Sequence, residues 1–333
     1  MTALVSRFRW ELLLAVLIVA AGAWSANLSP FYLEPDQLLA SAQYFVIFGI
    51  VAFGLMPVVV HGEIDISLAS TLAVGTVLFA RMAEAKVPVA VAIVVVLVAC
   101  AVLGAVNGLL VAYTNLPSLA VTLGTLGAYR GLAYIIGGEA GFSDFPPSYA
   151  YPGFNFVGLV PVSLFFFIAV ALLTGFLMSA TRFGRYSYAI GNSVAASRFA
   201  GVPVVRTKIL GFVFAALTAG VAALLWIGQY GSARADNADG SILFILTAVV
   251  LGGVAIEGGS GSVTGVALSI LLLGTITNGM GLANVPGTTQ SLVQGLLLVL
   301  SIGIPKAVGL IRARRQPRPT VAPIPIGPID DQA

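Results

Sequence analysis

The stretch PVAVAIVVVLVACAVLGAVNGLLVAY, residues 88–113, runs for 26 residues without a charged side chain. A helix needs about 20 apolar residues to cross the hydrocarbon core of a membrane, where its backbone groups are all hydrogen-bonded internally. A membrane-spanning strand would instead alternate apolar and polar residues every two positions, which this stretch does not do. Residues 88–113 therefore predict a membrane-spanning helix.

Apolar runs of this kind fill most of the chain. Of its 333 residues, 59% are hydrophobic and only 9% are charged, whereas soluble domains carry about 25% charged residues. Such a chain cannot cover a soluble surface, so we predict an all-α integral membrane protein with about ten transmembrane helices. The predicted spans are residues 11–29, 39–60, 66–84, 88–113, 117–137, 156–180, 207–231, 240–257, 261–281 and 289–306.

The basic residues predict the orientation. Cytoplasmic loops of membrane proteins carry an excess of Lys and Arg. With ten spans and a cytoplasmic N-terminus, twelve basic residues fall inside and three outside, namely Arg81, Lys86 and Arg234. We therefore expect both termini to be cytoplasmic, with an N-terminal segment 1–10, a transmembrane domain 11–306 and a Pro/Arg-rich tail 307–333. The basic residues follow this topology and indicate no nucleic-acid partner.

Two stretches place glycines and polar residues where an unbroken helix would be expected. They are HGEIDIS at 61–67 and LGGVAIEGGSGS at 251–262, each of which interrupts an apolar run. Paired discontinuous helices in two halves of a transporter often border the substrate path. We predict helix breaks or gates in two similar halves, with the candidate residues Gly62, Glu63, Asp65, Ser67, Gly252, Gly253, Glu257 and Gly258.

The acids of the first stretch have two interpretations. Asp65 stands just before Ile66-Ser67-Leu68 and is expected to cap the next helix, because its carboxylate can accept free backbone N–H groups there. Glu63 and His61 are expected to pair with a basic residue of another loop. Alternatively, these three groups form a proton relay, since ionisable residues in a membrane are rare and usually functional. Together with Arg130 they would be the coupling groups of an ion-coupled carrier.

The longest inside loop, residues 181–208, contains five basic residues. Its centre, Asn192 to Phe199, can form a short helix with Ala195, Ala196 and Phe199 on one side. An exposed helix of this kind is a handle for a soluble partner.

Several motifs together resemble one family. They are GEIDISLAS at 62–70, GAVNGLLVAY at 104–113, LPSLAVTLGTLGAYRGLAYII at 116–136, TRFGRYSYAIGNSVAASRFAGVPVVRTK at 181–208 and AVVLGGVAIEGGSGSVTGV at 248–266. In order and spacing they are similar to the permease subunits of ABC importers for ribose, xylose, arabinose, rhamnose and autoinducer-2. The resemblance covers about residues 40–305. The chain departs from the family pattern at Leu68-Ala69, where a Val-Gly pair is usual.

The resemblance implies a multi-pass subunit of the bacterial inner membrane, paired with a second permease subunit, identical or paralogous. It also implies separate ATPase subunits that use ATP and Mg, and an external sugar-binding protein. This chain has no GxxxxGK[ST] phosphate loop, so we expect that it does not hydrolyse ATP by itself. It has one histidine, one cysteine and no HExxH or GxSxG motif, so we expect no bound cofactor or metal and no enzymatic activity of its own. The loop 181–208 resembles the helix that couples to the ATPase, which implies contacts by Arg185, Asn192, Ala195, Ala196, Phe199 and Gly201.

The solute is expected to be polar and mostly uncharged, because the spans offer hydrogen-bonding side chains but only one fixed cation. The candidates for lining the pathway are Asn107, Thr122, Thr125, Tyr129, Arg130 and Asn278. GEIDIS, GFSDFPPSYAYPG at 141–153 and GLANVPG at 281–287 resemble the rhamnose branch, so rhamnose or another deoxy sugar is the first prediction. Autoinducer-2, ribose and other pentoses stay open. An ion-coupled carrier that uses Glu63 and Asp65 is the alternative function.

Overall fold

The computed structural model describes residues 9–28, 32–34, 38–39, 41–114 and 116–315. The predicted N-terminal segment and tail therefore lie largely outside the described residues. Within the described part, the chain is helical except for loops and one two-stranded hairpin. This confirms the predicted all-helical architecture.

Each of the ten predicted spans contains a helix. These helices are α2 (Arg9–Leu28), α4 (Gln43–Val60), α5 (Leu68–Glu84), α6 (Val89–Thr114), α7 (Ser118–Gly137), α9 (Val162–Ala180), α12 (Val204–Tyr230), α13 (Ile242–Leu251), α14 (Val263–Leu282) and α15 (Gly287–Arg315). Among the described residues, six of them, α2, α6, α7, α9, α12 and α14, are long and apolar enough to cross a membrane. The length and composition of these helices fit a multi-pass membrane protein.

The remaining elements lie between the spans. They are α8 (Pro147–Phe154), β1 (Phe156–Val157), β2 (Val160–Pro161), α10 (Arg182–Asn192) and α11 (Val194–Phe199). The two strands form an antiparallel hairpin. The span expected from residue 156 therefore begins only at Val162, because the first six residues form this hairpin instead.

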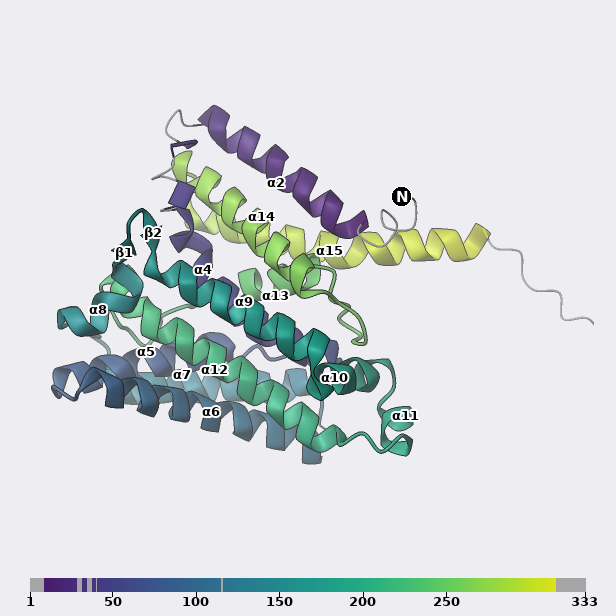
Figure 1. The fold of residues 1–333 in the computed structure, drawn as a ribbon, viewed down its shortest axis with the longest axis horizontal. Helices are drawn as coiled ribbons and strands as arrows, with labels where there is room; N and C mark the ends of the chain where they lie inside the picture. The colour runs from purple at the N-terminus through teal and green to yellow at the C-terminus, as the bar shows by residue number, and fades with distance from the viewer. Residues whose placement is uncertain (1–8, 29–31, 35–37, 40, 115, 316–333) are drawn as a thin grey trace, which may run out of the picture.

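The core lies around α4 and α12. From Phe45 to Val60, every side chain of α4 except Phe48 is buried. Helix α12 packs against α4, α5 and α6, while α2 packs against α14 at one edge (Figure 1). The uniformly apolar sequence of α4 thus reflects a helix that is surrounded by other helices.

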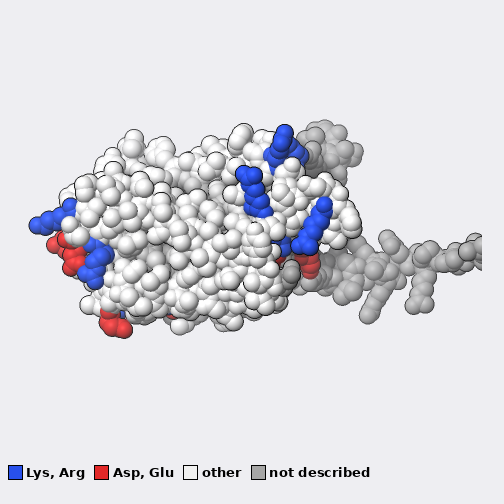
Figure 2. Space-filling model, turned by 90° about the horizontal axis from the view of Figure 1, so that it is seen from below, with Lys and Arg blue, Asp and Glu red and all other residues white. Residues whose placement is uncertain are grey.

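Charged residues gather at the two ends of the molecule. Helices α6, α7, α9 and α12 run between an end with α10 and α11 and an end with α8 and the hairpin (Figure 1). On the face in Figure 2, Lys, Arg, Asp and Glu lie at these two ends, with an uncharged belt between them. An uncharged belt of this kind is what the hydrocarbon of a membrane requires.

Small residues allow α6 and α12 to pack closely. A methyl group added at Gly104 would lie 2.6 Å from the Phe212 carbonyl oxygen, and one at Gly108 would lie 2.8 Å from the Ile209 Cα. Gly104 and Gly108 thus allow the backbones of the two helices to approach closely.

We predict that Gly104→Ala destabilises the protein by about 1–3 kcal/mol, because the added methyl group would overpack the contact with α12. The measurement is the midpoint of thermal unfolding of the purified protein in detergent. The matched control is Gly175→Ala in α9, where an added methyl group meets no atom within 4 Å. Equal midpoints for the two variants would contradict this account of the packing.

Candidate functional site

The two predicted helix breaks lie against each other. The Gly259 N–H donates a 2.9 Å hydrogen bond to the carbonyl oxygen of Val60, the last residue of α4. A methyl group added at Gly258 would lie 2.7 Å from the Gly62 nitrogen. We call segment 61–67 the first break and segment 252–262 the second break.

Glycine is required at the contact between the two breaks. Gly62 has a φ of +79° and Gly258 a φ of +89°, in the left-handed region that side chains disfavour. The missing side chains also let the two backbones touch. Gly62 and Gly258 are therefore needed both for the left-handed turn of each break and for the close contact between the two backbones.

Helix α10 is hydrogen-bonded to both breaks. On the first break, the Ser187 hydroxyl lies 2.8 Å from His61 Nε2. On the second break, the Tyr188 hydroxyl donates to the Gly261 carbonyl at 3.0 Å, and the Asn192 amide donates to the Gly259 carbonyl at 3.3 Å. A displacement of α10 would therefore act on both breaks.

Close packing reinforces these hydrogen bonds. A methyl group added at Gly191 of α10 would lie 2.0 Å from the Val60 carbonyl oxygen and 2.2 Å from the Gly259 nitrogen. Gly184, Ser187 and Ile190 of α10 are buried. Ser187, Tyr188 and Gly191 were not among the predicted site residues, because their segment was expected to be a loop. The spacing of Gly184, Ser187 and Gly191, by three and four residues, is the signal that could have revealed a packed helix face.

A buried polar network secures the first break. Asp65 Oδ1 accepts hydrogen bonds from the Ser67 backbone N–H at 2.9 Å and from the Ser67 hydroxyl at 2.6 Å. The Asn107 amide donates to the Ser67 hydroxyl at 2.8 Å, and the Tyr129 hydroxyl donates to Asn107 Oδ1 at 3.1 Å. The network joins the break to α6 and α7.

The N-cap position of α5 lies two residues after the one that was expected. Ser67, not Asp65, is the N-cap position of α5, and its side chain forms no capping bond. The Asp65 carboxylate nevertheless receives a backbone N–H as expected, because it closes a local turn with Ser67 directly before the helix. Its second oxygen, Oδ2, is buried with no hydrogen-bond partner among the described residues.

Glu63 is paired with a basic residue as expected, whereas His61 is not, because its ring lies against the Ser187 hydroxyl. The Glu63 carboxylate forms an ion pair with Lys208 near the start of α12, and both side chains are largely buried, at 15% and 13% exposure. The two charges therefore compensate each other at this end of the molecule.

Arg130 does not join Glu63, Asp65 or His61 through any ion pair or hydrogen bond of the described residues. Its guanidinium donates to the carbonyl oxygens of Ala235 at 2.5 Å and Asn237 at 2.9 Å. Arg130 thus holds the loop that precedes α13. His61, Glu63, Asp65 and Arg130 thus each have separate partners and form no single chain of contacts among the described residues.

The other pathway candidates have varied surroundings. The Thr122 hydroxyl lies 3.2 Å from the Ile64 carbonyl oxygen and so also ties α7 to the first break. Thr125 is half-buried and lies 3.4 Å from the Thr122 carbonyl. Asn278 is buried in α14, and its amide nitrogen has no partner among the described residues. That these side chains line a pathway stays a prediction.

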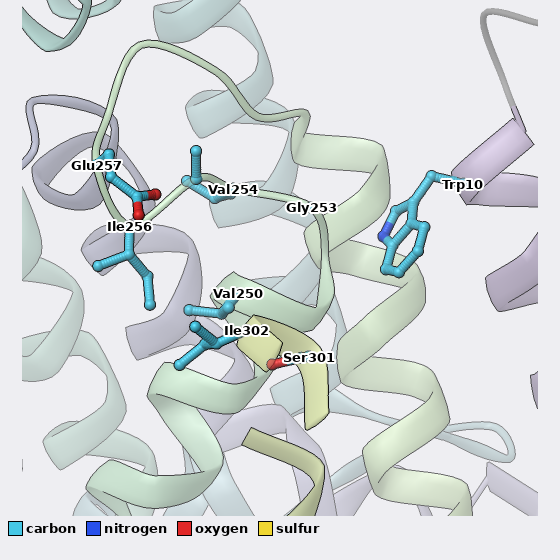
Figure 3. A pocket seen from close by; sticks show the side chains of 9 residues that line it. Trp10, Val250, Gly253, Val254, Ile256, Glu257, Ser301 and Ile302 are labelled. Atoms are coloured by element: carbon cyan, nitrogen blue, oxygen red, sulfur yellow. The ribbon is translucent and has the colours of Figure 1, made fainter. Parts of the chain in front are cut away.

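The second break differs from the first because a cavity lies beside it. The cavity of about 350 Å³ is bounded by segment 253–257, the end of α13, α15 and Trp10 of α2 (Figure 3). The Trp10 indole N–H donates to the Leu251 carbonyl at 2.9 Å, where α13 ends. Glu257 is exposed, and Gly252 and Gly253 follow α13 directly. The sequence analysis gave no role to Trp10, because nothing in the sequence links it to a residue 241 positions away.

The predicted coupling residues lie at one exposed tip. Helix α11 begins after Ser193, whose hydroxyl accepts from the Ala196 N–H at 3.2 Å. Ala195 and Ala196 are exposed, as are Arg185, Asn192 and Gly201, and the Phe199 side chain is 94% exposed. The expected helix from 192 to 199 is confirmed from Val194 onward, while Asn192 ends α10. The Phe199 ring is therefore accessible at this tip, and aromatic side chains are enriched at protein–protein interfaces.

Comparison with known proteins identifies the family to which this chain belongs. Residues 37–302 match the family model described as "Branched-chain amino acid transport system / permease component". The chain belongs to this permease family. The residues matched include both breaks, α10 and α11.

Among its relatives in the family is the autoinducer 2 import system permease protein LsrD of Photorhabdus laumondii. It is 35% identical over 303 residues, which are 89% of this chain and 91% of the relative. The proteins of the same name from Salmonella typhimurium and Escherichia coli O9:H4 are 33% and 34% identical, each over 92% of this chain and 94% of the relative. No solved structure matches the chain.

This membership confirms the predicted resemblance to importer permeases. The permease is a transport subunit and not an enzyme, and it resides in the inner membrane as a multi-pass protein. Among the described residues, no group of His, Cys, Asp and Glu is suited to hold a metal ion.

We predict that Asp65→Asn keeps most of the stability of the permease, whereas Asp65→Ala lowers it by about 1–3 kcal/mol. An asparagine oxygen can still accept both bonds from Ser67, but alanine leaves the buried Ser67 N–H without a partner. The measurement is thermal unfolding in detergent, with Asp144→Ala, at an exposed position just before α8, as the control. An equal loss in both Asp65 variants would indicate that the charge itself is needed.

Proposed function

We propose that this permease forms, with a second permease subunit, the pathway of an ATP-driven importer for a neutral, sugar-like solute. In this proposal the ten predicted spans all cross the membrane, both termini are cytoplasmic, and the end with α10 and α11 faces the cytosol. The observation that carries the proposal is that α10 is bonded to both helix breaks and leads directly into the exposed α11.

The geometry suggests how ATP hydrolysis is coupled to transport. An ATPase subunit that holds Phe199, Ala195 and Ala196 would displace α11 when it closes. Helix α10 would follow, because only Ser193 separates the two helices. The hydrogen bonds of α10 to His61, Gly259 and Gly261 would then transmit the movement to both breaks. ATP and Mg are bound by the partner ATPase in this scheme.

The second break is the better candidate for the moving element. Segment 61–67 is tied to α6 and α7 by the network of Asp65, Ser67, Asn107 and Tyr129. Segment 252–262 has the cavity beside Trp10 into which it can move. A packed core resists displacement, while a void beside a loop gives it room.

The solute-binding protein would dock at the opposite end. There, a hollow of about 860 Å³ lies beside α8 and is bordered by Asp144, Tyr151 and Asn155. Aromatic and hydrogen-bonding side chains of this kind suit a protein interface.

The solute is proposed to be autoinducer-2 or a related small sugar. The names of the relatives that are 33–35% identical over about nine-tenths of the chain favour autoinducer-2. Rhamnose, predicted first from the motifs, is retained as the second candidate, and ribose and other pentoses as the third. A neutral solute agrees with the placement of Arg130. Its guanidinium already donates to the carbonyl oxygens of Ala235 and Asn237, so it is not placed to bind an anionic solute.

The proposal predicts that uptake into reconstituted vesicles requires ATP, the ATPase subunit and the binding protein together, and that a protonophore does not reduce it. The measurement is uptake of radiolabelled autoinducer-2, rhamnose and ribose, each with its own binding protein. Omission of the ATPase serves as the control. Uptake by this chain alone, driven by a proton gradient, would favour the ion-coupled carrier with Glu63 and Asp65 as coupling groups.

We also predict that Ala196→Glu in α11 lowers ATPase association and solute uptake at least about tenfold, because a charged side chain would disrupt an apolar contact of the exposed tip. The measurements are co-purification of the ATPase and ATP-driven uptake, with membrane insertion checked separately. The matched control is Ala85→Glu, the same change at an exposed position of the outer end. Unchanged association in the Ala196 variant would remove α11 from the coupling interface.

A further inference from the structure

A second hollow lies at the inner end of the molecule, away from both breaks. Its volume is about 490 Å³, and it lies between the end of α6, the tip of α11 and the first turns of α12. The residues that matter for its chemistry are Tyr113, Arg198, Val205, Arg206, Ile209 and Leu210.

The charges of this hollow are all of one sign. Arg198 from α11 and Arg206 from α12 border it, and no acidic residue does. Neither arginine forms an ion pair with a carboxylate among the described residues, whereas the nearby Lys208 is paired with Glu63. Two unpaired guanidinium groups at one hollow favour a ligand with a phosphate, which they can bind with two parallel hydrogen bonds each.

The rest of the hollow is apolar, and exposed apolar side chains of α6 and α12 lie next to it. Leu210 of α12 is 46% exposed, and Leu109 and Leu110 of α6, just before Tyr113, are 45% and 38% exposed. Tyr113 itself is 68% exposed at the end of α6, where tyrosine is typical of the boundary between membrane and water. A ligand here would place an anionic group at the arginines and an apolar chain along α6 and α12.

We propose that this hollow binds one anionic phospholipid, with its phosphate at Arg198 and Arg206 and an acyl chain against Leu210 and Ile209. Basic pockets at the cytoplasmic ends of membrane helices bind anionic headgroups in this manner. Because Arg198 belongs to α11, the lipid would brace the coupling tip against α12. The site requires only the folded chain in a membrane and does not depend on the proposed solute or on ATP hydrolysis.

The test is native mass spectrometry of the purified full-length chain with phosphatidylglycerol and, separately, phosphatidylcholine. We expect wild type to retain phosphatidylglycerol in preference to phosphatidylcholine. The double variant Arg198→Ala/Arg206→Ala should bind phosphatidylglycerol about tenfold more weakly, since each cationic side chain near an anionic lipid contributes a few-fold. The matched control is Arg182→Ala/Arg185→Ala, which removes two exposed arginines of α10 that do not border the hollow.

Two further arms identify the ligand. Leu210→Gln should weaken the lipid severalfold, and millimolar inorganic phosphate should not displace it, because a lipid also needs the apolar face. Thermal unfolding in detergent verifies that each variant is folded. The proposal is overturned if both double variants retain the lipid like wild type, if both lose it equally, or if phosphate displaces it. It is also overturned if Arg198→Ala/Arg206→Ala loses only the ATPase subunit, because the arginines then serve a protein contact.

Discussion

The hydrogen bond from Gly259 to the carbonyl of Val60 represents the constraint on which the rest of this structure depends. A helix that is interrupted near a membrane frees backbone groups that lipid cannot satisfy. Here the second break satisfies the Val60 carbonyl at the end of α4, and side chains of α10 satisfy the Gly259 and Gly261 carbonyls of the second break. The two breaks can be present only because they meet, and they can meet only because glycine occupies the contact.

This constraint connects the exposed tip at α11 to the two breaks. Helix α10 supplies Ser187, Tyr188 and Asn192 to both breaks and is followed at once by the exposed α11. The first break is further held by Asp65 and its buried network, while the second lies beside a cavity. A force on α11 would therefore reach a first break that is held in place and a second break that has room to move. That asymmetry would turn a push from the cytosol into a directed movement.

Several features of the site could be predicted from the sequence because they are local. Glycines and acids inside apolar runs revealed both breaks, and the basic segment 181–208 revealed the exposed helix with Phe199. Contacts between distant segments could not be predicted. The pairing of Glu63 with Lys208 joins residues 145 positions apart, and the contact of Trp10 with Leu251 spans 241 positions. One chain without aligned homologues carries no signal for such pairs, since many side chains could serve equally well as partners.

By itself, the sequence determined that the protein is surrounded by lipid, that it is helical, and where its membrane helices approximately end. Lipid tolerates only long apolar segments whose backbone groups are hydrogen-bonded within the segment. It also determined where those helices are interrupted. Only the tertiary structure decided that the two interruptions touch, that α10 holds them together, and that Asn107, Thr122 and Tyr129 support the first of them. These choices depend on how the helices pack in three dimensions, and apolar runs of similar composition are compatible with many packings.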